Sequence, residues 1–246
     1  MKLSDSLDAG SAGLTGSVAG FHFSAVRPET LGATEYTLVT LVLDKTGSVA
    51  AFAPALFGIT QAVVEACRRS PRADYLLLRL VEFASEVDEV HGFKPLADIL
   101  GGDYLTPACH GLTALNDALF AAVSASNAYG QRLAEQDYLA NAIVIVATDG
   151  DDNASHTRVA DLRAELQRGV QAEHLESLRS VLVGINAGQH SASLQAFQQA
   201  AGLDQYVDVA DATPQKLAQL AAFVSRSISA QSQALGTGGP SQALTF

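Results

Sequence analysis

The sequence predicts an α/β fold with a doubly wound, mostly parallel central sheet, helices on both faces of the sheet and one antiparallel edge strand. Short apolar runs alternate along the chain with segments in which apolar residues recur every three or four positions. Strands that alternate with helices in this way form parallel sheets covered on both sides. The 246 residues, 48% of them hydrophobic, are enough to bury one substantial core, so we expect a single domain.

The regular pattern begins at Tyr36, after an alternating stretch over residues 18–26 that predicts one extra strand. Apolar runs predict strands at residues 36–43, 75–83, 142–147, 180–185 and 206–209. Residues 87–91 are expected to return antiparallel to the strand before them, as an edge hairpin. Amphipathic stretches predict helices at residues 52–67, 115–123, 159–166 and 194–197. A last helix is expected to start at Thr213-Pro214, with the Thr213 hydroxyl as its cap.

This pattern divides the chain into three segments. Residues 1–35 form an N-terminal extension that holds the extra strand, residues 36–230 form the domain, and residues 231–246 form a flexible C-terminal tail. The tail contains Gly-Thr-Gly-Gly-Pro at residues 236–240, which is typical of a flexible break. Its last four residues are either a docking segment or a frayed end.

Charge and composition exclude several classes of partner. The formal net charge is −11 and the basic residues are scattered, whereas binding to a phosphate backbone requires clustered Lys and Arg. No apolar run approaches the roughly 20 residues of a membrane-spanning helix. We therefore expect no nucleic acid and no membrane insertion. With no secretory signal apparent and two cysteines, Cys67 and Cys109, in dissimilar contexts, the expected location is cytoplasmic.

Two carboxylates and three hydroxyls are expected to converge at one edge of the sheet. Asp44 and Asp149 each follow an apolar run, so both lie where a strand ends. Thr46 and Ser48 follow in a loop whose intervening glycine allows a sharp turn, and Thr113 lies at the start of a helix. In an open parallel sheet, ligands bind at the edge formed by the carboxyl ends of the strands.

This set of donors favours a hard divalent cation. Oxygen ligands without Cys or His select Mg²⁺, Mn²⁺ or Ca²⁺ over zinc or copper. Two carboxylates balance the charge of the ion, but neutral hydroxyls donate weakly, so the metal is expected to stay electrophilic and to keep a water at an open position. An acidic group from a partner could replace that water.

The same residues resemble the metal-ion-dependent adhesion site of the von Willebrand factor A (vWA) family, which has the form Asp-x-Ser-x-Ser, then Thr, then Asp. Asp44, Thr46, Ser48, Thr113 and Asp149 match it in order, with Thr46 in place of the usual first Ser. The resemblance covers roughly residues 36–228. It implies a six-element α/β sandwich, Mg²⁺ in the site, and binding of a protein ligand through a Glu or Asp that completes the coordination of the metal.

By this resemblance, the chain is similar to stand-alone bacterial vWA proteins, including those grouped with tellurite-resistance proteins. These are expected to act as scaffolds or adaptors in stress-response or defence assemblies. The resemblance therefore implies a metal-dependent protein-recognition module that is not an enzyme.

Two neighbours of the site depart from a simple metal-binding pattern. Lys45 either lowers metal affinity, pairs with Asp151 or Asp152, attracts an acidic partner, or is a solvated lysine on a turn. The Asp-Asp-Asn sequence at residues 151–153 adds negative charge that could hold waters or repel an acidic ligand. The favoured interpretation is that these residues form the turn and cap the next helix, as does Ser155.

The segment at residues 43–48 also resembles the phosphorylated loop of P-type pumps and their haloacid-dehalogenase relatives. In these proteins the Asp at the end of the first strand is a nucleophile and a later acidic loop binds Mg²⁺. The alternative function is therefore a Mg²⁺-dependent phosphatase or phosphotransferase with Asp44 as nucleophile. Against it, the sequence offers no convincing second acid or separately placed lysine, and Thr113 is left unexplained.

Other catalytic patterns have no support in the sequence. The six histidines are dispersed, without a paired-Cys or HExxH context for zinc. Cys109 and His110 are adjacent on an extended segment and should point in opposite directions, so a buried thiol and a surface imidazole are expected rather than a nucleophile and its base.

Overall fold

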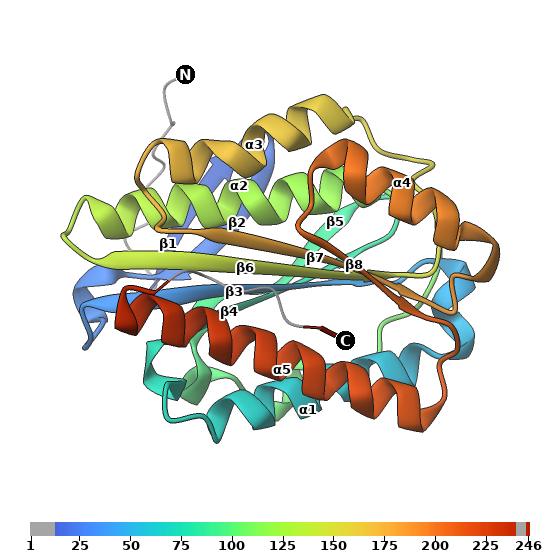
Figure 1. The fold of residues 1–246 in the computed structure, drawn as a ribbon, viewed down its shortest axis with the longest axis horizontal. Helices are drawn as coiled ribbons and strands as arrows, with labels where there is room; N and C mark the ends of the chain where they lie inside the picture. Colours follow the sequence, from blue (N-terminus) through green and yellow to red (C-terminus); the bar gives the residue numbers. More distant parts are fainter. Residues whose placement is uncertain (1–12, 240–244) are drawn as a thin grey trace.

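The computed structural model describes residues 13–239 and 245–246, and its centre is an eight-stranded sheet (Figure 1). The strands are β1 (Gly13–Val18), β2 (Phe21–Val26), β3 (Glu35–Asp44), β4 (Leu76–Phe83), β5 (Val87–Pro95), β6 (Leu139–Thr148), β7 (Leu178–Ile185) and β8 (Gln205–Val209). Their order is β1-β2-β5-β4-β3-β6-β7-β8. The neighbouring strands β4, β3, β6, β7 and β8 are all parallel to one another, whereas β5 runs antiparallel to β4.

Helices cover both faces of this sheet. The α-helices are α1 (Ala53–Arg68), α2 (Leu115–Ala134), α3 (Val159–Gln171), α4 (Ser191–Ala201) and α5 (Pro214–Thr237). In Figure 1, α1 and α5 lie below the sheet and α2, α3 and α4 lie above it. Short 3₁₀ helices fill the connections: η1 (Pro28–Thr30), η2 (Gly47–Ala51), η3 (Ala73–Tyr75), η4 (Leu96–Asp98), η5 (Gly101–Asp103) and η6 (Gly188–His190). The predicted α/β fold class is confirmed.

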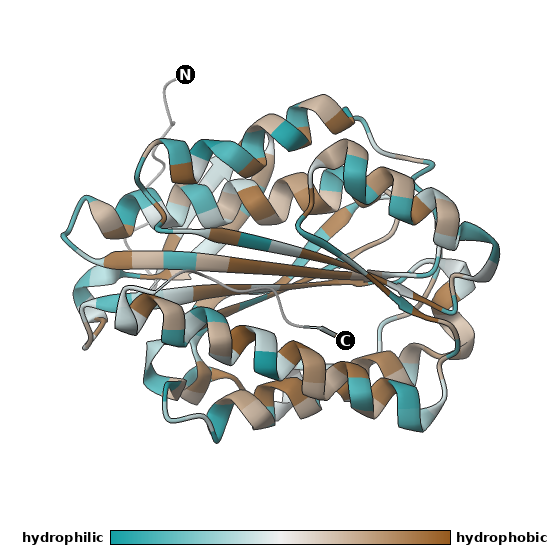
Figure 2. Ribbon diagram, viewed as in Figure 1, coloured by the Kyte–Doolittle hydropathy of each residue, from teal (hydrophilic) through white to brown (hydrophobic). Residues whose placement is uncertain are grey.

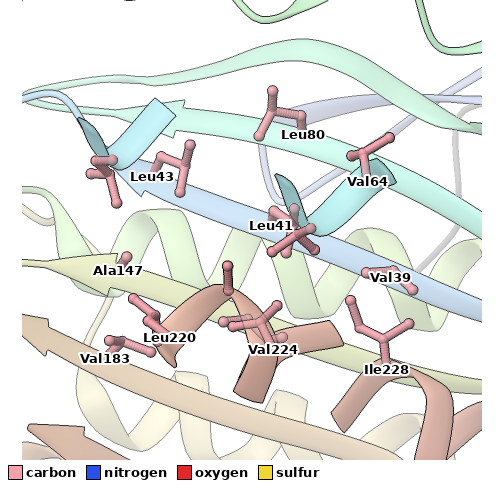
Figure 3. Close-up of a cluster of buried hydrophobic side chains, with 14 of the residues drawn as sticks. Val39, Leu41, Leu43, Val64, Leu80, Ala147, Val183, Leu220, Val224 and Ile228 are labelled. Atoms are coloured by element: carbon pink, nitrogen blue, oxygen red, sulfur yellow. The ribbon is translucent and has the colours of Figure 1, made fainter. Parts of the chain in front are cut away.

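Alternation along the central strands supplies a core on each face. Val39 and Leu41 of β3 point toward α1 and α5, where they meet Val224 (Figure 3). Val42 faces the other side and packs in the cluster that contains Leu119 of α2. Because the central strands are buried on both faces, they are apolar along nearly their whole length, as the hydropathy colouring shows (Figure 2).

The N-terminal segment differs from the single extra strand predicted over residues 18–26. It forms the hairpin β1–β2, which turns at Ala19 and Gly20 with φ of 51° and 91°. Two consecutive residues with positive φ are what a tight hairpin turn requires. Strand β2 pairs in parallel with β5 at Ala25 and Phe93, so β5 lies inside the sheet and is not the edge strand that was expected.

The C-terminal helix extends beyond its predicted end. Helix α5 continues to Thr237, so residues 231–237, which the sequence assigns to the tail, are helical. Gln231 is buried, and its backbone carbonyl accepts a hydrogen bond from Asn141 Nδ2 at 2.8 Å. Thr213 precedes the helix as predicted, but its hydroxyl donates to Asp211 Oδ1 at 2.6 Å and does not cap the helix.

Both chain ends include residues outside the described ranges, namely 1–12 and 240–244. The expected flexible break at 236–240 is therefore covered only as far as residue 239, and the division into extension, domain and tail stays a prediction. At the terminus, the ring of Phe246 lies edge-on to Phe223, with 5.6 Å between the centroids. None of the helices in the described part of the chain has both the length and the apolar character needed to cross a bilayer.

Candidate metal site

Asp44 lies at the carboxyl end of β3, in the centre of the sheet, and its side chain is fully buried. Both of its carboxylate oxygens accept hydrogen bonds. The backbone N–H of Thr46 donates to Oδ1 at 2.7 Å, and the Thr148 hydroxyl donates to Oδ2 at 2.6 Å. The carboxylate is therefore held in one orientation by the ends of two neighbouring strands.

Thr46 and Ser48 connect Asp44 to Asp149, the second predicted carboxylate, because the Thr46 N–H donates to Asp44 and the two hydroxyls continue the hydrogen bonds to Asp149. The Thr46 and Ser48 hydroxyls are 3.0 Å apart, and Ser48 Oγ donates to Asp149 Oδ1 at 2.8 Å. Strands β3 and β6 are adjacent, with Leu43 paired to Ala147, which brings the two carboxylates to the same edge of the sheet. Four of the five predicted ligands thus share one hydrogen-bonded cluster.

Thr113, the fifth predicted ligand, is attached to this cluster through its backbone. Its N–H donates to Asn153 Oδ1 at 2.7 Å, and its carbonyl accepts the N–H of Asn153 at 2.9 Å. Among the described residues, no hydrogen bond joins the Thr113 hydroxyl to the other four side chains. The Thr113 side chain is buried, and its backbone hydrogen bonds place Thr113 beside the loop that follows Asp149.

Sequence reasoning missed Thr148 and misplaced the role of the loop that follows it. The residues after Asp149 were expected to cap the next helix, but α3 begins after Arg158 without a side-chain cap. Instead, Asp152 Oδ2 accepts the N–H of Asn116 at 2.8 Å, at the start of α2. The sequence gives little indication of this cap, because Asp152 follows Asn116 by 36 residues and only the fold brings the two together.

Two further carboxylates, Asp117 and Asp151, attach the same loop to its surroundings. In the reverse direction, Asp117 of α2 accepts the N–H groups of His156 and Thr157 in the loop, at 3.0 and 2.8 Å. Asp151 contacts the start of α4, where its Oδ2 lies 2.8 Å from His190 Nδ1 and its Oδ1 accepts the Ser193 hydroxyl at 2.5 Å. The loop therefore connects Asp149 to α2 on one side and to α4 on the other.

Lys45 does not pair with Asp151 or Asp152, which were two of its predicted partners. Its ammonium lies 2.7 Å from Asp88 Oδ2 and 3.5 Å from Glu82 Oε2, on the antiparallel pair β4–β5. Burial acts to lower the pKa of Lys45, but these two carboxylates raise it above its ordinary value. The lysine is therefore neither a freely solvated turn residue nor a counter-charge for Asp44.

The electrostatics of the cluster fit a bound cation. Burial raises the pKa of Asp44, and the nearby charge of Asp149 adds to this, although hydrogen bonds from Thr148 and Thr46 oppose it. Burial likewise raises the pKa of Asp149. Neither carboxylate forms an ion pair with a described residue, so a divalent cation would supply the missing positive charge.

The donor set also limits which ion and which chemistry suit the site. Within the described ranges, no group of three His, Cys, Asp or Glu side chains is arranged to hold a metal. A cation here would depend on two carboxylates, on hydroxyls and on water, which suits hard ions. A nucleophilic Asp44 is less compatible with the geometry, because this carboxylate is fully buried and both of its oxygens already accept hydrogen bonds.

Comparisons with known proteins identify the fold. No family model and no curated protein matches the chain. Solved structures with a similar fold include the PilB minor pilin from Streptococcus sanguinis, which matches over 85% of this chain and 64% of the pilin with 12% identity and a TM-score of 0.60. A von Willebrand factor type A protein from Catenulispora acidiphila matches over 78% of this chain, with 17% identity and a TM-score of 0.53.

A third structure carries a named metal site. Proximal thread matrix protein 1 from the mussel byssus, described with a zinc-occupied MIDAS motif, matches over 80% of this chain with 22% identity and a TM-score of 0.51. The chain spans 46% of that protein and 43% of the Catenulispora protein. These similarities show that the chain has the vWA fold.

Proposed function

We propose that the chain is a metal-dependent protein-interaction module. A divalent cation would be held by Asp44, Thr46, Ser48, Thr113 and Asp149. We propose Mg²⁺ as this cation, with Mn²⁺ or Ca²⁺ as substitutes. The cation would bind a Glu or Asp side chain of a partner protein. The observation that carries this proposal is the pair of buried carboxylates, Asp44 and Asp149, at the carboxyl edge of the sheet without a cationic partner among the described residues.

The chemistry of the cluster supports this role. The cation supplies a positive charge that can attract an acidic ligand. The hydroxyls of Thr46 and Ser48 are neutral metal ligands, so the ion would stay electrophilic and would bind a further oxygen ligand. The zinc-occupied MIDAS motif of the mussel protein, which has the same fold, is consistent with a cation at such a site.

The wider biological role is also a proposal. We propose a cytoplasmic scaffold or adaptor in a bacterial stress-response or defence assembly, of the type grouped with tellurite-resistance proteins, and no enzymatic activity. This part rests on the resemblance in sequence motifs alone, since a fold does not assign a function.

Affinity purification tests the proposal directly. Wild type, Asp149→Ala and the control Asp98→Ala are each used as bait in Mg²⁺ and in EDTA. Asp98 is an exposed acid in η4, at the opposite end of the sheet. We expect partners that bind wild type and Asp98→Ala in Mg²⁺, and that are absent in EDTA and with Asp149→Ala. Partners retained under all conditions would contradict metal-dependent recognition, and phosphatase turnover lost in Asp44→Asn would favour the enzymatic alternative.

A further inference from the structure

A groove of about 540 Å³ adjoins the candidate metal site. It lies where the turn of the β1–β2 hairpin, the β4–β5 turn and the first turns of α2 and α3 meet. Ser85 lines it, and the Ser85 hydroxyl accepts the N–H of Leu112 at 2.9 Å. Because Leu112 precedes Thr113, the groove and the candidate metal site share one rim of the molecule.

The groove has an apolar floor that is only partly covered. The rings of Phe21 and Phe120 are tilted by 51° with 6.0 Å between their centroids, and both are half-buried. Val87 is also half-buried beside them. Leu112, at the edge toward the metal site, is 56% exposed. An aliphatic chain laid on this floor would bury apolar surface that now faces solvent.

Of the three carboxylates in the walls of the groove, only Asp161 is paired with an arginine of the described part of the chain. Glu86 is exposed and forms no ion pair with any described residue. Asp161 is different, because Arg158 already donates two hydrogen bonds to it at 2.8 and 2.9 Å. No Lys or Arg is among the described residues that line the groove.

Asp117 is the second carboxylate that lacks a permanent counter-charge, but it is largely buried and its two oxygens accept the backbone N–H groups of His156 and Thr157. Burial would raise its pKa, but hydrogen bonds from Thr157 and His156 hold the pKa below its usual value, so the group is ionised near neutral pH. The nearest imidazole nitrogen, His156 Nδ1, is 3.6 Å from Asp117 Oδ2 on an exposed ring. The groove therefore combines an aromatic floor with the negative charges of Glu86 and Asp117.

We propose that this groove binds a basic side chain, arginine above all, of the protein partner. The aliphatic stem would lie on Phe21 and Phe120, and the guanidinium would pair with the exposed carboxylate of Glu86, with the negative charge of the largely buried Asp117 nearby. Arginine suits such a place because its planar cation stacks on aromatic faces and pairs with carboxylates. The net charge of −11 also favours a basic ligand. That the ligand belongs to a protein rests on the proposed function, whereas the groove itself needs no metal.

A fragment experiment separates the groove from the metal site. N-acetyl-arginine methylamide is titrated into ¹⁵N-labelled full-length protein, in EDTA and in Mg²⁺, while amide chemical shifts are recorded. We expect saturable shifts at Phe21, Val87 and Phe120 under both conditions. The neutral isostere N-acetyl-citrulline methylamide should bind more weakly by about threefold or more, as expected for loss of an exposed charge pair.

Two matched variants test the charge. Glu86→Gln should weaken arginine binding by about threefold, whereas Glu176→Gln, an exposed site in the loop before β7, should leave it unchanged. Shifts at other residues, no saturation, equal binding of the citrulline probe, or equal effects of the two variants would each overturn the proposal. Failure of the metal site would appear separately, as an absence of Mg²⁺-dependent shifts at Asp149 and Gly150.

Discussion

At the scale of single residues, the most consequential feature is a carboxylate buried in the middle of the sheet. Asp44 is fully buried, accepts hydrogen bonds from Thr46 and Thr148, and faces the charge of Asp149. Hydrogen bonds offset part of the cost of burying its charge, but the raised pKa shows that they do not offset all of it. A site that is unfavourable for two anions alone becomes favourable when a cation joins them.

Replacement of Asp44 by Asn should therefore have opposite effects with and without metal. In EDTA, we expect Asp44→Asn to raise Tm by about 2–4 °C, the shift that about 1 kcal/mol produces in a domain of 150–250 residues. In Mg²⁺, the variant should show no metal-induced rise in Tm, because one of the two carboxylates is gone. Differential scanning calorimetry of both proteins in both buffers measures this. A variant that is less stable in EDTA and still responds to Mg²⁺ would contradict the assignment.

The same carboxylate predicts a pH dependence with a definite sign. Since the folded pKa of Asp44 lies above its ordinary value of 3.8, the folded state binds the proton more tightly than the unfolded state does. The contribution of Asp44 to stability is therefore present below pH 3.8 and is lost as pH rises through the folded pKa.

Urea unfolding in EDTA over a series of pH values measures this effect. Relative to Asp44→Asn, the free energy of unfolding of wild type should fall as pH rises above 3.8, by at most about 1.4 kcal/mol per pH unit, and then level off. Comparison with the variant removes the contributions of other groups, such as Asp117, whose pKa is lowered. A difference that does not change with pH would mean that the pKa of Asp44 is not raised.

At the scale of elements, the loop after β6 connects parts of the site that are distant in sequence. Asn153 holds Thr113, Asp152 caps α2, and Asp151 contacts the start of α4. The helix that presents Thr113 is thereby fixed relative to the strand that presents Asp149. Positioning of this kind is as important to a metal site as the ligands themselves.

Loss of the Asn153 side chain should loosen this connection. Asn153→Ala leaves the N–H of Thr113 without its acceptor, which should reduce the free energy of unfolding by about 1–2 kcal/mol and reduce the Mg²⁺-induced rise in Tm. Asn153→Asp keeps an acceptor at the same position and serves as the matched control. Thermal unfolding of the three proteins with and without Mg²⁺ is the measurement. An unchanged Mg²⁺ response in Asn153→Ala would show that Thr113 does not need this anchor.

The N-terminal hairpin is joined to the sheet by a close backbone contact and by hydrogen bonds to Glu89, which also pairs with a buried arginine. Arg79 of β4 is 1% exposed, and its Nε lies 2.6 Å from Glu89 Oε2. Glu89 Oε1 in turn accepts the N–H and the hydroxyl of Ser24 at 2.9 and 2.6 Å. At Gly92, an added Cβ would lie 1.9 Å from Ser24 O, so β2 can approach β5 only because this residue has no side chain.

Gly92→Ala should consequently displace the hairpin. We expect a loss of about 1–3 kcal/mol in the free energy of unfolding, as for other overpacked sites, and faster hydrogen exchange in residues 13–26. Gly58→Ala is the matched control, since nothing lies within 4 Å of a Cβ at Gly58 in α1. That change should stabilise by about 0.5–1 kcal/mol. Equal effects of the two substitutions would mean that the hairpin is not held by this contact.

At the scale of the whole molecule, the sequence predicts what depends on local patterns and misses what depends on tertiary contacts. The parallel strands are found because burial on both faces makes them apolar runs, and the ends of β3 and β6 bring Asp44 and Asp149 to one edge. Metal binding at that edge stays a prediction. The β1–β2 hairpin is missed because its turn places Ala19 at positive φ, a position where alanine is uncommon.

Two residues differ from what their local sequence predicts, and in both cases a contact with a residue distant in sequence explains the difference. Gly236 reads as the start of a flexible break, yet it lies within α5, where an added Cβ would meet the guanidinium of Arg72. Lys45 reads as a neighbour of the acidic loop, yet it pairs with Asp88 across the sheet. Neither contact follows from spacing along the chain, because each depends on how the helices and strands pack in three dimensions.

If the cation site is coupled to the fold, Mg²⁺ should stabilise the whole molecule by mass action. Asp44 ends β3 and Asp149 directly follows β6, and these central strands support both cores. Binding at their ends should therefore raise the free energy of unfolding by RT ln(1 + [Mg²⁺]/Kd). Above Kd, each tenfold increase in Mg²⁺ adds about 1.4 kcal/mol, or about 3–6 °C in Tm for a domain of this size. Calorimetry over a Mg²⁺ series, matched in ionic strength with NaCl, tests this in wild type, Asp149→Asn and Asp98→Asn. We expect the rise in wild type and Asp98→Asn only, and an identical rise in Asp149→Asn would show that Mg²⁺ acts elsewhere on this acidic chain.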